Sequence, residues 1–412
     1  MANTTHILIV NQHGDNRGDE AALRAMIDEF TNRLGDVRFT ILHQFRDRNL
    51  RPRLDAQVEW HSLVLNPLIG LGLLIAALLR PLGIGKSPRG NSQLAQFRRA
   101  YESADLVVSA PGGPYFGDIY AAHEIVHWFY VWLARRYGKP AFLYATSVGP
   151  FRHRLLNPVR RIMFRRFDKL CVREDLSRAM LEDFVPGVTV EVTADSALQR
   201  KPYQPKPAPQ DTDLVVGMTV RHHPFADAAD EEERKALQAR YVEVLDDAVR
   251  HLAARGATKL VLFPQLYGTA HSDVPVLEAF AERHQDVIAT EIFDPEADSD
   301  MQREAIRACD LFIASRYHPQ IFAASAGVPG ICIAYEHKMT GFMKQMGLDR
   351  FAFPVDDLDK TKVIAAIDEA LDKRAELSPQ MIEAASRLHD RSCNTTARAV
   401  ELIDASRARA AA

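Results

Sequence analysis

Cysteine is scarce in this sequence, and its distribution argues against both a disulfide framework and a metal site. Only four cysteines occur among 412 residues, and no two of them form a Cys-x-x-Cys pair. Widely spaced thiols of this kind are typical of a protein that folds in a reducing compartment. We therefore expect buried free thiols and no metal centre. The four are Cys171, Cys309, Cys332 and Cys393.

Several other signals are absent, and each absence excludes a class of function. The chain enters the apolar run HILIV almost at once, without the basic and cleavage segments of a signal peptide, so we expect a cytoplasmic location. A Gly-x-Gly-x-x-Gly motif is missing, which argues against a dinucleotide cofactor. The formal charge of −3 provides no basic field for nucleic acid. A small-molecule or glycan partner without a bound cofactor fits better.

One long uncharged run stands out, from residue 62 to residue 79, and Arg80, Lys86 and Arg89 follow it. Its length is at the lower limit of roughly 18 to 20 apolar residues for crossing a bilayer, and a proline and two glycines interrupt its first half. A buried or interface helix, a segment resting on the inner face of the cell membrane, and a true span remain open alternatives.

Apolar strand-like runs alternate with amphipathic helical patterns along most of the chain. Runs at 7–10, 37–42, 106–109 and 141–146 are apolar throughout, which indicates strands buried on both faces of a parallel sheet. A segment rich in proline and polar residues follows at 201–212, and the alternation then restarts.

This order predicts an α/β protein with two Rossmann-like domains, whose parallel sheets face a cleft. The N-terminal domain would cover residues 1–200, with an apolar insertion at about 62–88, and residues 201–212 would be the linker. The C-terminal domain would cover 213–378, and residues 379–412 would form a helical segment.

Two glycine-containing segments follow strands of the first domain. In NQHGDNRGDEAA, Gly18 lets the backbone approach a ligand, and Asp19 lies at the start of the next helix as a cap or a base. In SAPGGPYFGD, Gly112 and Gly113 predict a turn, and Asp118 could accept a sugar hydroxyl's proton. Both segments are therefore candidate loops for acceptor contacts.

The second domain carries cations at its strand ends. Arg221 follows the run DLVVGMTV, with His222 and His223 directly after it. Arg316 and His318 follow DLFIAS, at the start of a predicted helix whose positive end adds to their charge. Guanidinium, imidazole and helix N-terminus together predict an anion site. Tyr335 and Lys338 follow the next strand and extend the same rim.

These residues resemble the polysaccharide pyruvyl transferase family. The likeness runs in order through an Asn-x-Gly-Asp-Glu segment, a Gly-Gly pair followed by an acid, VREDLS, TADSAL, Ser-Arg-x-His and GVP…Tyr-x-x-Lys-x-x-Gly-Phe. It covers about residues 7 to 350. The apolar run at 62–79 departs from the family's pattern and leaves the acceptor open, because the first domain would contact it.

The resemblance implies a fold similar to the GT-B glycosyltransferases and a transferase that uses phosphoenolpyruvate to form a pyruvate ketal on a sugar of a polysaccharide or glycan precursor. Arg221, Arg316 and His318 would bind the donor, with Lys338 and Tyr335 at the rim. His318 would also supply a proton, and Asp118 or Asp19 would be the base. The acceptor could be lipid-linked.

Two other readings remain open. A nucleotide-sugar-dependent glycosyltransferase of the same architecture could hold a ribose with Glu336, which follows the strand after SAGVP. A non-catalytic glycan-binding protein could share the fold without the chemistry.

Overall fold

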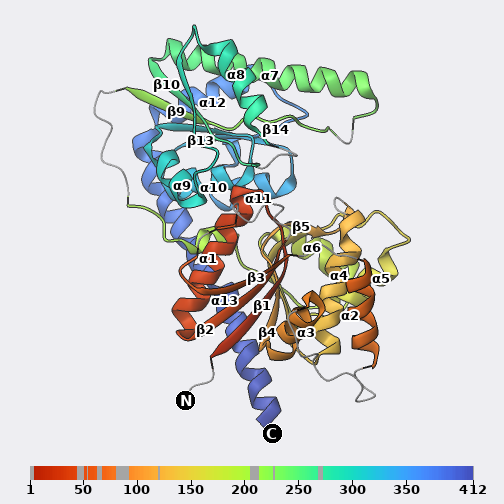
Figure 1. Ribbon diagram of the computed structural model, residues 1–412. Coiled ribbons are helices and arrows are strands. Elements are labelled where there is room, and N and C mark those ends of the chain that lie inside the picture. Colours follow the sequence, from red (N-terminus) through yellow and green to blue (C-terminus); the bar gives the residue numbers. More distant parts are fainter. Residues whose placement is uncertain are drawn as a thin grey trace. The chain divides into compact units, whose positions relative to one another are not determined.

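The computed structural model describes residues 4–43, 51–52, 54–62, 67–79, 92–118, 121–204, 213–225, 228–267 and 272–411 (Figure 1). Its contacts divide the chain into two compact units. Unit 1 consists of Met1–Gly14, Ala22–Gln199 and Asp390–Ala412, and unit 2 of Asp15–Ala21 and Arg200–His389. The short segment from Asp15 to Ala21 therefore packs with residues that follow it by more than half the chain.

Unit 1 is built on a parallel sheet with strand order β3-β2-β1-β4-β6-β7-β8, and β5 pairs with β6 beside this path. Strands β1 and β6 are buried along their whole length, as their continuous apolar runs predict. The strands are β1 (Thr5–Gln12), β2 (Val37–His43), β3 (Gln57–Ser62), β4 (Leu106–Ser109), β5 (Gly112–Phe116), β6 (Ala141–Val148), β7 (Lys169–Val172) and β8 (Val190–Val192).

Helices cover both faces of this sheet, and the residues of β1 alternate between the two cores. Ile7 and Ile9 join a core with α1 (Arg17–Leu34) and the end of α13 (Arg374–Ala411). Leu8 and Val10 join the core on the other face. Five helices contribute to that second core: α2 (Pro67–Leu79), α3 (Gln93–Ser103), α4 (Ala121–Arg136), α5 (Asn157–Phe164) and α6 (Asp175–Phe184).

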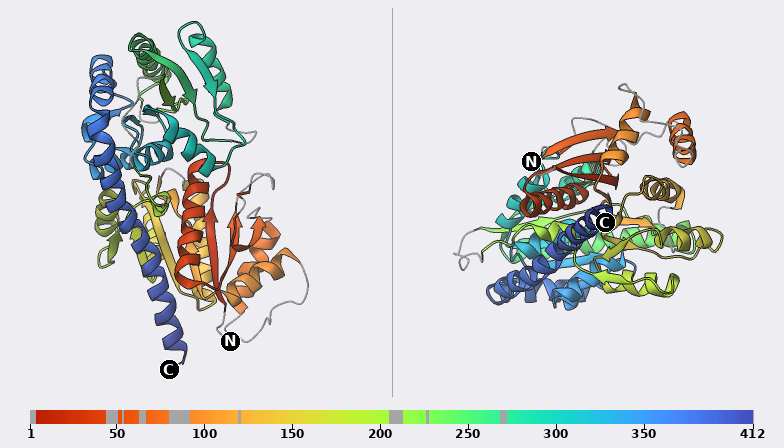
Figure 2. Two further views of the ribbon diagram at one scale, coloured as in Figure 1. Left: turned by 90° about the vertical axis from the view of Figure 1, so that its left-hand side faces the viewer. Right: turned by 90° about the horizontal axis from the view of Figure 1, so that it is seen from below.

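Unit 2 contains a second parallel sheet, with strand order β11-β10-β9-β12-β13-β14. The strands are β9 (Leu214–Met218), β10 (Ala257–Leu262), β11 (Ala289–Ile292), β12 (Leu311–Ala314), β13 (Gly330–Ala334) and β14 (Ala352–Pro354). The helices are α7 (Glu231–Ala254), α8 (Val274–His284), α9 (Ser299–Ala308), α10 (Tyr317–Ser325), α11 (His337–Gln345), α12 (Lys360–Asp372) and the first part of α13. The predicted α/β class with two parallel sheets is confirmed (Figure 2).

Local structure differs from expectation at two glycine-containing segments. Gly18 lies in the first turn of α1 and not in a preceding loop, because the side-chain oxygen of Asn16 accepts the Gly18 N–H at 2.8 Å and begins the helix there. Gly112 and Gly113 form the start of strand β5 and not a turn. The hydroxyl of Thr146 on β6 donates to the Gly113 carbonyl at 2.9 Å, which helps to hold this strand against its neighbour.

Two of the predicted segments, the apolar run and the linker, lie only partly within the described residues. The apolar run is helical as α2, whereas residues 63–66 and 80–91 lie outside the described part. Residues 205–212 of the expected linker also lie outside it. Helix α13 begins already at Arg374, so Pro379 lies within its first turns. Among the described residues, no helix is both long and apolar enough to cross a membrane. All four thiols are free.

Candidate active site

The carboxyl ends of three neighbouring strands of unit 2 carry the cations that the sequence singles out. Strand β12 pairs with β9 on one side and β13 on the other, all in parallel. Arg221 follows β9, Arg316 follows β12 and Tyr335 follows β13. The chain reverses its winding direction between β9 and β12, and ligands of open α/β sheets bind at such a point.

Arg221 is held by its neighbours on two sides. Its guanidinium carbon lies 4.3 Å from the centre of the Tyr335 ring, and its Nε donates to the His222 carbonyl at 3.2 Å. Burial, together with the positive charge of Arg316, lowers the pKa of Arg221 from its ordinary value. That ordinary value is so high that the side chain stays charged at neutral pH.

A tyrosine hydroxyl ties the ends of β9 and β12 together. Tyr241 on α7 accepts the backbone N–H of Arg221 at 3.3 Å and donates to the Ser315 hydroxyl at 2.9 Å. The backbone N–H of Ser315 donates in turn to the Thr219 hydroxyl at 2.8 Å. These bonds fix the positions from which both arginine side chains begin.

Arg316 occupies the N-cap position of α10, and one side of its guanidinium is already engaged. Its Nη2 donates to a carboxylate oxygen of Asp273. The other Asp273 oxygen accepts the backbone N–H groups of Gln265 and Leu266, each at 3.0 Å. Within the described part of the chain, Nε of Arg316 has no hydrogen-bond partner. A buried donor without a partner at the predicted anion site is a candidate contact for a ligand anion.

The imidazole of His318 packs against the first turn of α1. A Cβ atom added to Gly18 would lie 1.8 Å from His318 Nδ1, far closer than any real contact. Only glycine therefore permits this approach. The neighbour here is the side chain of His318, whereas the close approach of a ligand to Gly18 stays a prediction. Asp19 follows Gly18 directly and is 8% exposed, like His318 itself.

Aromatic and charged side chains connect Tyr335, at the end of β13, to His318 on α10. Lys338 Nζ lies 2.8 Å from a carboxylate oxygen of Glu336, 5.8 Å from the Tyr335 ring centre and 5.7 Å from that of Tyr317. The rings of Tyr317 and His318 are 5.1 Å apart. Ring and cation–π contacts thus connect Arg221, Tyr335, Lys338 and His318, by way of Tyr317. Arg316 joins them through its charge, which acts on Arg221.

Asp118 belongs to unit 1, where its carboxylate is already occupied. It accepts the guanidinium of Arg160 at 2.7 Å and the backbone N–H groups of Arg152 and His153. Burial acts to raise the pKa of Asp118, but the hydrogen bonds from Arg160 and Arg152 outweigh it and lower the pKa below its ordinary value. A carboxylate with a lowered pKa and this many donors is a poor proton acceptor. Its hydrogen bonds hold the backbone of Arg152 and His153.

Sequence reasoning gave little weight to His223, although it lies in the same cluster. The side chain is 1% exposed, and its ring centre is 4.6 Å from that of Tyr241 and 5.5 Å from that of Tyr335. Neither ring nitrogen has a hydrogen-bond partner among the described residues. Burial, followed by the charges of Arg221 and Arg316, lowers its pKa to about 2, so the ring is neutral. Its position two residues after Arg221 was the available signal in the sequence.

Arg17 and Asp273 were missed altogether. Arg17 contacts Glu20 at 2.7 Å and the Pro295 carbonyl at 2.8 Å, and its guanidinium carbon lies 3.8 Å from the centre of the Tyr267 ring. It anchors the 15–21 segment in unit 2. Nothing in the sequence around Asp273 predicts its contact with Arg316, because the two are 43 positions apart.

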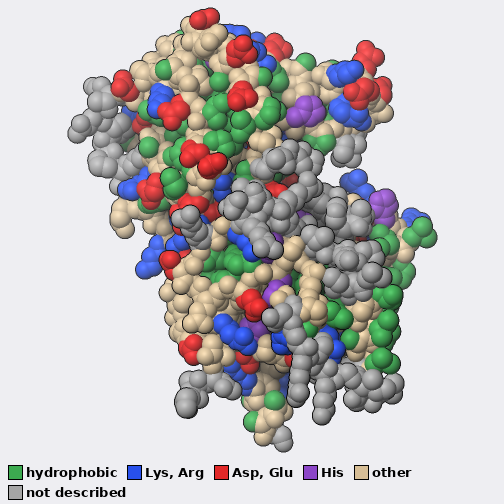
Figure 3. Space-filling model, viewed as in Figure 1, with side chains coloured by type: hydrophobic (Ala, Val, Ile, Leu, Met, Phe, Trp, Pro, Cys, Tyr) green, Lys and Arg blue, Asp and Glu red, His purple; other side chains and the backbone are tan. Residues whose placement is uncertain are grey.

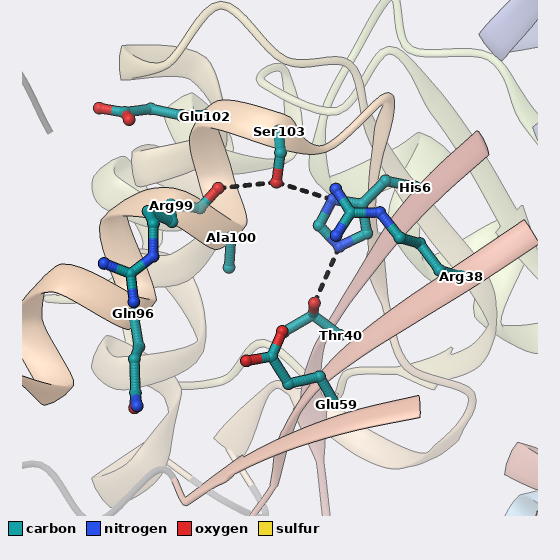
Figure 4. Close-up of a pocket in the computed structure, with 9 residues that line it drawn as sticks. All are labelled: His6, Arg38, Thr40, Glu59, Gln96, Arg99, Ala100, Glu102 and Ser103. Carbon is teal, nitrogen blue, oxygen red and sulfur yellow. Dashed lines mark hydrogen bonds between the residues drawn. The ribbon is translucent and has the colours of Figure 1, made fainter. Parts of the chain in front are cut away.

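A pocket of about 440 Å³ lies at the amino edge of the unit 1 sheet (Figure 4). It is next to His6 and Arg38, near the amino ends of β1 and β2, and the side chains of Glu59, Arg99 and Glu102 surround it. His6 is bound there to the Thr40 and Ser103 hydroxyls at 2.8 and 2.9 Å. The amino edge of a parallel sheet is not where α/β proteins bind substrates, so this pocket is a feature apart from the site above.

Comparison with known proteins identifies a family. A family model described as polysaccharide pyruvyl transferase matches residues 16–337. The chain is also 25% identical over 418 residues to the amylovoran biosynthesis protein AmsJ of Erwinia amylovora, covering 92% of this chain and 95% of AmsJ.

Solved structures share the fold at low sequence identity. A UDP-GlcNAc 2-epimerase from Neisseria meningitidis bound to UDP-GlcNAc is 12% identical, with a TM-score of 0.56 and coverage of 97% of this chain and 99% of the epimerase. HepE of Anabaena in complex with UDP and glucose is 13% identical, with a TM-score of 0.56 and coverage of 97% and 100%. These similarities show a common α/β fold of the GT-B type.

Proposed function

The chain belongs to the polysaccharide pyruvyl transferase family, and we propose that it transfers the pyruvyl group of phosphoenolpyruvate to two hydroxyls of one sugar in polysaccharide biosynthesis. The product is a cyclic pyruvate ketal. The relative AmsJ supports the biosynthetic context, since it is named for the biosynthesis of a polysaccharide.

The observation that carries this proposal is the cationic network at the ends of β9, β12 and β13. Phosphoenolpyruvate offers a phosphate and a carboxylate on a three-carbon frame. Arginine matches both groups because its planar fork donates two parallel hydrogen bonds and keeps its charge when partly buried. Unit 2 supplies two arginines, Arg221 and Arg316, and the positive amino end of helix α10.

The reaction requires a proton donor and groups that stabilise the leaving phosphate. The methylene carbon of the donor gains a proton and becomes a methyl group, while one sugar hydroxyl adds to the carbon that bears the carboxylate. The C–O bond to phosphate then breaks, and the second hydroxyl adds to the same carbon. Of the two hydroxyl protons released, one balances the proton taken up by carbon and the other leaves with phosphate. No redox step occurs, so the reaction requires no redox cofactor.

The residues of unit 2 suit these steps. His318 is placed at the first turn of α10 beside the cationic groups, where its protonated ring would deliver the proton to the methylene carbon. Arg221 and Arg316 would bind the phosphate and carboxylate and stabilise the charge that develops on phosphate, each contributing roughly 3 kcal/mol if well placed. Lys338 and Tyr335 would complete the anion site.

Asp19 is the better candidate for the base that accepts the hydroxyl proton. Asp118 is already bound by Arg160 and two backbone N–H groups, whereas Asp19 belongs to unit 2 together with His318 and the arginines. The acceptor remains a sugar or a lipid-linked glycan.

A transfer assay tests the proposal. Phosphoenolpyruvate labelled at its methylene carbon should yield a labelled ketal methyl group on an acceptor glycan, together with one equivalent of phosphate. The similarity to HepE in complex with UDP and glucose supports a second candidate, a nucleotide-sugar glycosyltransferase. A panel of UDP-sugars in the same assay separates the two. Sugar transfer without phosphoenolpyruvate would favour the second, and binding of glycan without any transfer would favour a non-catalytic protein.

A further inference from the structure

Three helices on one side of unit 1 expose apolar side chains to solvent. On α2, Leu71, Ile75 and Leu78 are 52%, 47% and 52% exposed. Their spacing of i, i+4 and i+7 puts them in one stripe along the helix. The opposite face of α2 carries Leu73 and Ala77, which are buried in the core of unit 1. The exposed stripe is therefore a second apolar face, which the described residues leave uncovered.

The same spacing recurs at α5. Leu155, in the turn before this helix, is 94% exposed, and Val159 and Ile162 on the helix are each 54% exposed. Between the two stripes, α4 exposes Ile125 to 65%. Its partly buried Phe129 and Trp132 are stacked with ring centres 5.9 Å apart. Isolated apolar residues on a surface are ordinary, but repeated stripes on adjacent helices are not.

Contacts within unit 1 place these helices next to one another. Arg136 at the end of α4 donates to the Ala77 carbonyl of α2 at 3.0 and 3.2 Å. Elsewhere on α4, the ring of Trp128 meets the ring of Phe164 on α5 edge-on, with ring centres 4.8 Å apart. Helices α2, α4 and α5 line the right-hand side of unit 1 in Figure 1, and hydrophobic side chains gather along that edge in Figure 3.

An arginine-rich segment forms the α5 end of this apolar face. The segment from Phe151 to Phe167 contains six arginines and no acidic residue. Four of these arginines are exposed, and two of the four, Arg161 and Arg165, donate to backbone carbonyls of Phe184 and Pro186. A carbonyl carries no net charge, so these bonds do not neutralise them. The exposed four are Arg152, Arg154, Arg161 and Arg165.

We propose that the exposed face of α2, α4 and α5 binds the surface of an anionic lipid bilayer. Apolar side chains of such a surface enter the boundary between headgroups and acyl chains, and arginines beside them contact lipid phosphates while their aliphatic stems stay in the apolar layer. A second copy of the chain is a poorer occupant, because a twofold contact would bring two arginine-rich segments of like charge together. This inference does not depend on the proposed activity.

Vesicle sedimentation tests the proposal with the full chain. We expect the protein to sediment with vesicles of phosphatidylcholine and phosphatidylglycerol, and at least tenfold less with phosphatidylcholine alone. The variant Leu155→Ser/Val159→Ser/Ile162→Ser should reduce partitioning to the anionic vesicles at least tenfold. Arg154→Gln/Arg165→Gln should reduce it severalfold and flatten its dependence on salt.

A matched control uses two exposed apolar residues of unit 2. Val287 and Met301 are 40% and 56% exposed, and Val287→Ser/Met301→Ser should leave partitioning unchanged. Far-UV circular dichroism checks that each variant is folded. Equal partitioning of all folded variants would overturn the proposal. A wild-type dimer that fails to bind vesicles and that the triple serine variant dissociates would overturn it in favour of a second copy.

Discussion

The guanidinium carbon of Arg221 lies 4.3 Å from the centre of the Tyr335 ring, so two strand ends of unit 2 share one cation–π contact. A cation–π contact of this kind helps to hold the guanidinium in place, and the Nε of Arg221 donates to the His222 carbonyl at 3.2 Å. The contact connects the end of β9 to the end of β13, with Arg316 on the strand between them.

This geometry predicts that lysine cannot replace Arg221. The variant Arg221→Lys keeps the charge but loses both the fork and the stacking, so kcat/KM for phosphoenolpyruvate should fall by about a hundredfold. Steady-state phosphate release measures the change. Arg350 provides a matched control, because its guanidinium carbon lies 4.5 Å from the centre of the Phe351 ring elsewhere in unit 2. Comparable losses in Arg221→Lys and Arg350→Lys would contradict the assigned role.

The contact between α1 and α10 predicts a coupled pair of substitutions. In a helix alanine is favoured over glycine by about 1 kcal/mol, yet Gly18→Ala should destabilise unit 2, because its Cβ atom would overlap the ring of His318. Removing that ring with His318→Ala should relieve the overlap, so the double variant should be more stable than Gly18→Ala alone. Urea unfolding of the four proteins gives the coupling energy. Additive effects would show that the two residues do not touch.

The buried ion pair of unit 1 should contribute to stability, and we assign it no direct role in binding the donor. Glu124 and Arg160 are each 1% exposed and 2.7 Å apart, and Asp118 also contacts Arg160. Glu124→Gln removes the negative charge that compensates most of the buried charge of Arg160. The free energy of unfolding should therefore fall by about 3 kcal/mol. The exposed pair Arg135–Asp168 is the control, and Arg135→Gln should cost less than about 1 kcal/mol. Equal losses from both variants, measured by urea unfolding, would contradict this account.

The lowered pKa of His6 predicts how the stability of the folded chain depends on pH. Burial, followed by the charge of Arg38, lowers the His6 pKa from 6.5 to about 4, so the folded chain holds the ring neutral. Above pH 6.5 neither state is protonated at this site, and its contribution to stability is complete. As the pH falls from 6.5 towards 4 the unfolded chain takes up a proton that the folded chain does not, and the contribution is lost.

We therefore expect the urea midpoint of the wild type to fall between about pH 7 and about pH 5, and that of His6→Gln to fall less. Glutamine preserves a hydrogen-bonding side chain near the Thr40 and Ser103 hydroxyls, so both proteins should be folded at neutral pH. An equal fall in the two midpoints would show that His6 is not the group responsible.

Much of the fold could be predicted from the sequence because it depends on short-range patterns. Continuous apolar runs such as LVVS and GICIA identify strands buried on both faces, and they fix where the strands end. Arg221, Arg316 and Tyr335 were found because each follows such a run directly. Parallel pairing then brings their positions to one edge of the sheet.

The missed features depend on partners far along the chain. Strand β5 was taken for a turn because its two glycines favour turns, whereas its pairing with β6 and the hydroxyl of Thr146 stabilise an extended form. Asp273 is held beside the end of β10 by its hydrogen bonds from Gln265 and Leu266, and no local sequence pattern predicts that it contacts Arg316. Arg17 likewise acquires its role from Tyr267 and Pro295.

Calorimetric titration with phosphoenolpyruvate tests the central claim most directly, since that claim assigns the cationic network of unit 2 to a small dianion. We predict one binding site per chain in the wild type, an affinity about a hundredfold lower in Arg316→Gln, and wild-type affinity in the control Arg350→Gln. The same affinity in Arg316→Gln as in the wild type, or binding of UDP with none of phosphoenolpyruvate, would contradict the account.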